Sequence, residues 1–146
     1  MTKYVTLLLA VGFLIAAAAS AQEKTDKDKL QGTWQSVSAE QNGKEQDDAK
    51  EYKMIFEGDT FSVKRGDQVA FKGTFKLDPS KKPKTFDLTF TEGPDDLKGK
   101  TSPGIYELDG DNFKFCAPEP GTTDRPKEFK TAGTKNFMVQ LKREKK

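Results

Sequence analysis

The side chains that most enzymes use for nucleophilic and acid–base chemistry are scarce in this chain of 146 residues, which has no histidine and a single cysteine, Cys116. A Ser-His-Asp or Cys-His arrangement and a zinc site with histidine ligands therefore cannot form. Without a histidine to activate it, Cys116 is expected to be a partly buried small residue rather than a nucleophile. We predict no enzyme activity and no catalytic residue; an enzyme would need a cluster of acids around Arg125 or Tyr106.

Paired carboxylates are the remaining candidates for a metal site. None has the spacing of an EF-hand loop, and each pair lies among turn residues or lysines, so we interpret them as solvated turns and predict no metal site. No glycine-rich phosphate-binding loop follows a strand, so no cofactor is expected. The 25 basic and 23 acidic residues are interspersed, which gives no electrostatic basis for binding nucleic acid. The carboxylate pairs are Asp47 with Asp48, Asp95 with Asp96, and Asp109 with Asp111.

The 11 phenylalanines are the feature most relevant to binding. If their rings converge inside one barrel, they could line a dry pocket for a lipid-like or aromatic molecule, or they could fill the space completely. Both alternatives stay open, because both require large apolar residues that point inward. Arg125 could hold an anionic ligand at the mouth of the barrel, or tie its loop to a carboxylate or to backbone carbonyls. The candidate ligand-binding residues are Phe71, Phe75, Phe86, Phe90, Tyr106, Phe115 and Arg125.

The elements that must position these side chains are strands, because apolar residues recur with a period of two after residue 30. In the segment QVAFKGTFKL, for example, Val69, Phe71, Phe75 and Leu77 share one side. Turns such as Arg65-Gly66-Asp67 separate the segments, and gaps this short connect antiparallel neighbours. The expected strands cover residues 31–38, 51–57, 60–65, 68–77, 84–91, 102–108, 112–117 and 136–143.

A meander of about eight such strands must hide its apolar face and its two edges, and closure into a barrel does both. We therefore predict an all-β fold, an antiparallel up-and-down barrel. The interior of such a barrel is just filled by side chains or holds one small ligand. A two-sheet sandwich is the alternative, although its long crossing connections fit the short turns less well.

The stretch LQGTWQSVS is expected to close one end of this barrel. Gly32 lets the chain bend closely under the end, and the ring of Trp34, the only tryptophan, acts as a plug. Arg143 has the same phase as the inward residues of the last strand, so its guanidinium could stack on the indole. It could equally extend to solvent at the strand end.

The first 21 residues resemble a secretory signal peptide. Lys3 precedes an apolar run from Val5 to Ala19, and Ala19 and Ala21 form an A-x-A cleavage site. A membrane anchor is the competing interpretation, but the run is shorter than a membrane span requires. We therefore expect cleavage after Ala21, a flexible lead over residues 22–29 and one domain over residues 30–146. The mature protein is expected to be secreted, periplasmic or extracellular, monomeric, and without a membrane span.

These residues also carry a resemblance to known proteins. The Gly-Thr-Trp sequence on the first strand, the meander and the arginine of the last strand resemble the lipocalin and wider calycin pattern. More specifically, LQGTWQ, GIYELDGDNFKFC (residues 104–116), RPKEF (residues 125–129) and FMVQLKR resemble a family of exported lipocalin-like domains known mainly from planctomycete-type bacteria. The resemblance covers the mature chain. It implies a lipocalin-like barrel and export, but no activity, because the family has none assigned.

Two functions fit this sequence. The first is an exported, non-enzymatic binding protein, with a small apolar ligand inside the barrel or an envelope component as its partner. The second is a structural or protein-interaction module with a filled barrel, in which the loops at residues 92–100 and 118–133 make the contacts. A cavity of several hundred Å³ would favour the first function over the second.

Overall fold

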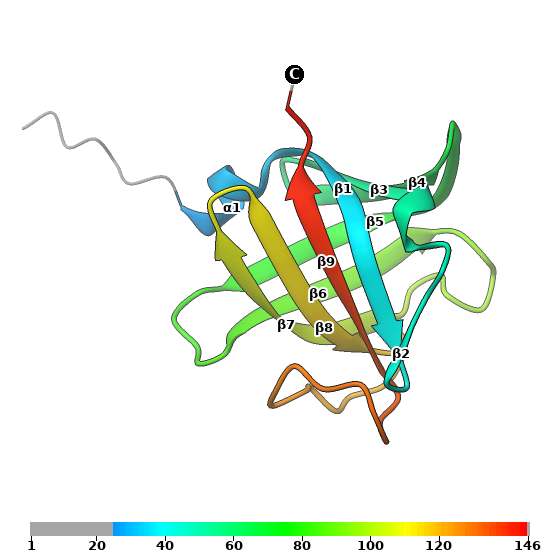
Figure 1. Cartoon of the computed structure of the whole chain (residues 1–146), viewed down its shortest axis with the longest axis vertical. Helices are drawn as coiled ribbons and strands as arrows, with labels where there is room; N and C mark the ends of the chain where they lie inside the picture. The colour runs from blue at the N-terminus through cyan, green and yellow to red at the C-terminus, as the bar shows by residue number, and fades with distance from the viewer. Residues whose placement is uncertain (1–24, 146) are drawn as a thin grey trace, which may run out of the picture.

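The alternation of apolar and polar residues places a row of side chains from each strand inside a closed antiparallel barrel (Figure 1). The computed structural model describes residues 25–145. Each strand pairs with the next around the barrel, and the first pairs with the last to close it. The barrel strands are β1 (Gly32–Gln41), β3 (Tyr52–Glu57), β4 (Thr60–Arg65), β5 (Gln68–Asp78), β6 (Lys84–Glu92), β7 (Thr101–Asp109), β8 (Asn112–Pro118) and β9 (Asn136–Arg143).

The prediction of an all-β, eight-stranded up-and-down barrel is confirmed, and each predicted strand overlaps one strand of the barrel. The sandwich alternative is excluded, because a single sheet closes on itself instead of two sheets packing face to face. A short extra strand, β2 (Lys44–Glu45), pairs with the end of β1, and a 3₁₀ helix, η1 (Ala49–Glu51), precedes β3.

A short helix, α1 (Asp26–Leu30), lies at one end of the barrel (Figure 1). The hydroxyl of Thr25 accepts a hydrogen bond from the Asp28 backbone N–H at 3.2 Å, which caps the first turn. Residues 25–29, which were expected to belong to a flexible lead, therefore start the folded domain. The predicted signal peptide lies outside the described residues. Within residues 25–145, no helix is long and apolar enough to span a membrane.

The connection between β8 and β9 lies at the opposite end of the barrel from α1 (Figure 1, orange). It also covers part of the outer face of β7 and β8. Ile105 and Cys116 point to this outer face, yet both are buried, and the Cys116 thiol lies 3.8 Å from the Lys130 carbonyl oxygen. Burial raises the pKa of this thiol. Cys116 is therefore a buried small residue, even more enclosed than the sequence suggested.

Candidate functional site

The two halves of the barrel interior are packed differently. In the half beside α1, the ring of Phe86 lies at the centre of an aromatic cluster, with four neighbouring rings at centroid distances from 5.5 to 6.3 Å. The Trp34 ring, 5.8 Å from that of Phe113, completes this half, which we call the solid half. Its aromatic residues are Trp34, Phe56, Phe75, Phe86, Tyr106 and Phe113.

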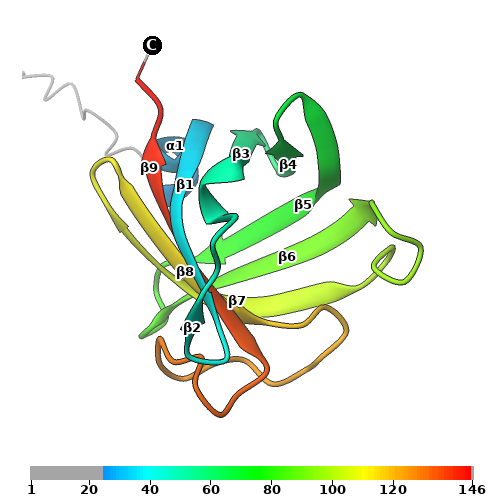
Figure 2. The same ribbon diagram turned by 45° about the vertical axis from the view of Figure 1, so that its right-hand side comes forward.

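The other half contains a cavity of about 410 Å³, within the range of small-molecule pockets. It forms where β1 separates from β3, because β3 pairs only with residues 32–35 of β1. The segment from residue 42 to 51 lies over this gap (Figure 2). The cavity walls are mainly apolar. They comprise Ala39, Ala49, Met54, Phe61, Val63, Phe71, Leu88, Phe90, Leu97, Phe115, Pro120, Phe137, Val139 and Leu141, with the polar residues Ser36, Glu40, Gln41, Gln46, Asp48 and Tyr52.

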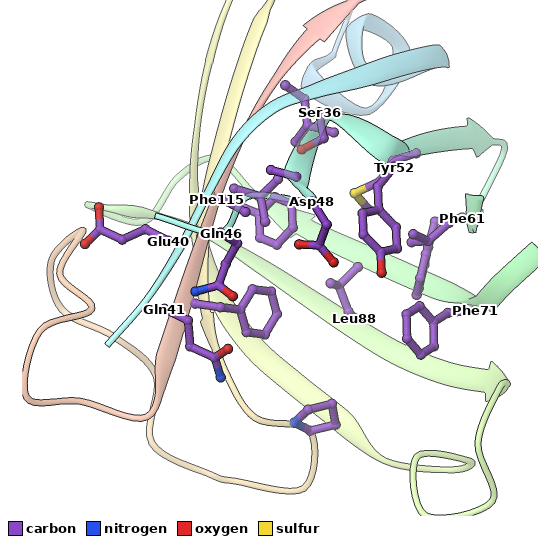
Figure 3. A pocket seen from close by; sticks show the side chains of 18 of the residues that line it. Ser36, Glu40, Gln41, Gln46, Asp48, Tyr52, Phe61, Phe71, Leu88 and Phe115 are labelled. Atoms are coloured by element: carbon purple, nitrogen blue, oxygen red, sulfur yellow. The ribbon is translucent and has the colours of Figure 1, made fainter. Parts of the chain in front are cut away.

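A β-bulge in β1 decides which of its residues face the cavity. The register against β9 shifts between Ser36 and Ser38, so the inward positions change from even to odd numbers. Ala39, which is small, therefore faces the cavity opposite Val139. Glu40 is turned away from the cavity in Figure 3, and its carboxylate accepts a hydrogen bond from the Thr131 hydroxyl. Two small inward residues on this strand, Ser36 and Ala39, leave room that large side chains would fill.

The polar groups of the cavity lie at two depths. Ser36, two residues from Trp34, forms part of the deep wall next to the solid half and is 3 % exposed. Within the described part of the chain, its hydroxyl forms no hydrogen bond. The other polar groups lie nearer the surface. Gln46 and Asp48 come from the segment over the gap, and Tyr52 is the first residue of β3 (Figure 3).

Of the residues predicted to bind a ligand, Phe71, Phe90 and Phe115 line the cavity. The rings of Phe71 and Phe90 meet edge to face at 5.9 Å. The structure does not bring the other four candidates to the cavity, since Phe75, Phe86 and Tyr106 belong to the solid half and Arg125 lies outside the barrel. The two alternatives for the aromatic residues thus apply to different halves of the same interior.

Arg125 ties its loop to neighbouring strands, which is one of the two roles that the sequence allowed. Its Nη1 donates a hydrogen bond to the Gly104 carbonyl oxygen at 2.6 Å, and its Nη2 lies 2.7 Å from Oδ1 of Asp87. These contacts tie the β8–β9 connection to the outer face of β6 and β7. The arginine therefore holds its own loop rather than the mouth of the cavity.

Tyr106 takes part in a polar contact that anchors α1. Its hydroxyl donates to Oδ2 of Asp26 at 2.7 Å, and the Lys84 ammonium lies 2.9 Å from the same oxygen. Burial together with this hydrogen bond raises the pKa of Tyr106 far above its ordinary value. Burial by itself would raise the pKa of Asp26, but its bonds with Tyr106 and Lys84 outweigh that effect and lower it. Both shifts follow from structural contacts.

The barrel end beside α1 is closed by Gly32, Trp34 and Arg143. The Arg143 guanidinium carbon lies 4.4 Å from the centre of the buried Trp34 ring, and its Nη1 donates to the Gln31 carbonyl oxygen at 2.7 Å. Gly32 has a φ of 115°, and a β-carbon there would lie 3.4 Å from Arg143 Nη1. Glycine thus permits both the bend of the chain and the close approach of the arginine.

The polar residues of the cavity were not predicted from the sequence. Asp48 was interpreted as one of a pair of turn carboxylates, and Gln46, Tyr52 and Ser36 were not considered. No pattern in the sequence identifies them, because the bulge in β1 and the fold of residues 42–51 bring them together. The described residues include no group of three or more histidine, cysteine, aspartate or glutamate side chains that could hold a metal ion.

Neither a protein-family model nor a curated protein nor a solved structure matches the chain. The resemblance to exported lipocalin-like domains therefore remains a prediction.

Proposed function

We propose that the protein is an exported, non-enzymatic binding protein that holds one small, largely apolar molecule in the cavity between the segment 42–51 and the sheet. The observation that carries this proposal is the cavity of about 410 Å³ with apolar walls in one half of the barrel. Ligand sites in proteins are typically concave and mostly apolar, with a few polar groups that orient the ligand. The solid half borders this cavity, since the ring of Phe115, which lines the cavity, lies 5.4 Å from that of Phe86.

The test is the binding of N-phenyl-1-naphthylamine, an uncharged apolar dye that fluoresces when it leaves water. We expect saturable binding of one dye per chain. The substitution Val139→Phe adds a ring to the cavity wall and should weaken binding at least tenfold. Val69→Phe is the matched control, because Val69 is 44 % exposed on β5 and does not line the cavity. A signal that does not saturate, or equal affinities of the dye for both variants, would contradict the proposal.

Native mass spectrometry of the protein recovered from its own cell envelope complements the dye. An added mass that disappears on unfolding identifies a natural ligand. A bare monomer mass, together with failure to bind the dye, would favour the alternative of a protein-interaction module that uses its loops.

Export is the second part of the proposal, and it rests on the basic start, apolar run and small residues of the first 21 positions. N-terminal sequencing of the mature protein checks it. We expect the sequence to begin at Gln22 and the protein to be found in the periplasm or the medium. A mature chain that begins at Met1 and stays in the cytoplasm would contradict this part.

A further inference from the structure

The cavity has an uneven distribution of charge. Its walls are apolar, and of the two acidic residues that line it, Glu40 is turned outward and engaged by Thr131. Asp48 is therefore the one charged side chain directed toward the cavity among the described residues, and no lysine or arginine lines it. A carboxylate at the entrance to an apolar cavity favours a cation at that point and disfavours an anion.

The Asp48 carboxylate is not already neutralised. Within residues 25–145 it forms no ion pair at 4.0 Å or closer and no side-chain hydrogen bond. The neighbouring cation, Arg65, is engaged elsewhere, since its Nη2 lies 2.5 Å from the Glu51 carboxylate and its Nη1 lies 3.5 Å from the Tyr52 hydroxyl. The negative charge of Asp48 is thus free to interact with a ligand.

The deep wall of the cavity carries one hydroxyl group. Ser36 is 3 % exposed as a residue and lines this wall of the cavity. A ligand that fills the cavity from Asp48 inward would reach this hydroxyl.

We infer that the ligand is an amphipathic amine, whose apolar body occupies the cavity and whose protonated amino group lies at Asp48. This inference rests on the proposed function and adds the chemical class of the ligand. Gln46, which comes from the same segment and also lines the cavity, adds an amide that can bond to the same head group (Figure 3). A fatty acid would place its carboxylate against Asp48 and is therefore a poor ligand.

The test compares three probes with the same twelve-carbon chain, namely dodecylamine, dodecanol and dodecanoate, each displacing N-phenyl-1-naphthylamine at neutral pH and below its micelle concentration. Because the Asp48 carboxylate is exposed to water, we expect dodecylamine to bind about three- to fivefold more tightly than dodecanol, which corresponds to about 0.6–1 kcal/mol. Dodecanoate should be the weakest of the three. High salt should reduce the preference for the amine, since the Debye length falls to about 3 Å at 1 M.

Two matched variants assign the preference to one carboxylate. Asp48→Asn removes the charge with almost no change in shape and should abolish the preference for the amine while the affinity for dodecanol stays the same. Asp47→Asn is the control, because Asp47 is its neighbour but does not line the cavity. This variant should behave like the wild type. Unchanged dodecanol binding also shows that each variant is folded.

The outcomes distinguish this inference from the proposed function. If none of the probes binds, the proposed function fails. If dodecanol binds but dodecylamine and dodecanoate bind equally well, or dodecanoate binds best, the cavity is a ligand site and the inferred amine is wrong. An equal effect of Asp47→Asn and Asp48→Asn would also overturn the inference, because it would assign the preference to the overall surface charge.

Discussion

Replacing Arg143 with methionine should destabilise the barrel, because this side chain of β9 connects the end of α1 to the ring of Trp34 at the closed end. Its Nη1 donates to the Gln31 carbonyl at 2.7 Å, its Nη2 bonds to the Lys29 carbonyl, and its guanidinium carbon lies 4.4 Å from the Trp34 ring. Methionine keeps an apolar chain over the indole but removes all three interactions.

The size of the effect follows from these contacts. A hydrogen bond from a charged donor contributes about 1.5–3 kcal/mol, and a cation–π contact contributes about 0.5–2 kcal/mol. The side chain of Arg143 is 27 % exposed, so water replaces part of what is lost. The ion pair with Asp111, whose side chain is 54 % exposed, contributes little. We therefore expect Arg143→Met to reduce the free energy of unfolding by about 2–4 kcal/mol, in the range of a broken buried network.

Equilibrium unfolding in urea measures this change, and the fluorescence of Trp34, the only tryptophan, reports on the closed end directly. Arg143→Lys keeps the charge but cannot donate to both carbonyls in the same geometry, so we expect an intermediate loss of about 1–2 kcal/mol. Lys142→Met, at the exposed neighbouring position, should change stability by less than about 0.5 kcal/mol. If Arg143→Met costs no more than Lys142→Met, the guanidinium does not hold the closed end.

Three further predictions each depend on the surroundings of a single residue. Asp26→Asn should cost about 2 kcal/mol at pH 7 through its bond to Tyr106. Because the pKa of Asp26 is lowered in the folded state, this cost should persist at higher pH and shrink as the pH falls below about 4, as acid titrations of both proteins would show. Gly73→Ala should lower the free energy of unfolding by about 3 kcal/mol or more, because its β-carbon would lie 1.9 Å from the Thr89 carbonyl oxygen. The thiol of Cys116 should be inert to a thiol reagent in the native protein and react after unfolding, because it is 0 % exposed.

Each of these expectations has a result that contradicts it. If the cost of Asp26→Asn does not change with pH, the contact with Tyr106 does not depend on the negative charge of Asp26. A Gly73→Ala variant as stable as the wild type would mean that β5 and β6 can separate locally without loss. Rapid modification of native Cys116 would show that the β8–β9 connection opens in solution.

The amino-acid sequence by itself determined the architecture of this protein. The period of two in segments such as QVAFKGTFKL and the short glycine turns are local signals, and together they specify antiparallel neighbours in sequential order. The phase of the strands also pointed to Gly32, Trp34 and Arg143 at the closed end, but whether Arg143 stacks on the indole or extends to solvent was settled only by the structure. Alternation predicted most of the inward residues, but Val69, which it placed on the side of Phe71 and Phe75, is 44 % exposed because the register between β4 and β5 shifts between Val69 and Phe71.

Only the tertiary structure decided where the interior is solid and where it is hollow. Phe75 and Phe90 have the same inward phase, yet one fills the aromatic cluster and the other lines the cavity. Their different roles depend on the bulge in β1 and on the early separation of β3 from β1, which are contacts between strands rather than properties of one segment. Asp48 faces the cavity for the same reason, because the fold of residues 42–51 carries it there. Packing of distant segments sets the shape of an interior, and no local pattern encodes that shape.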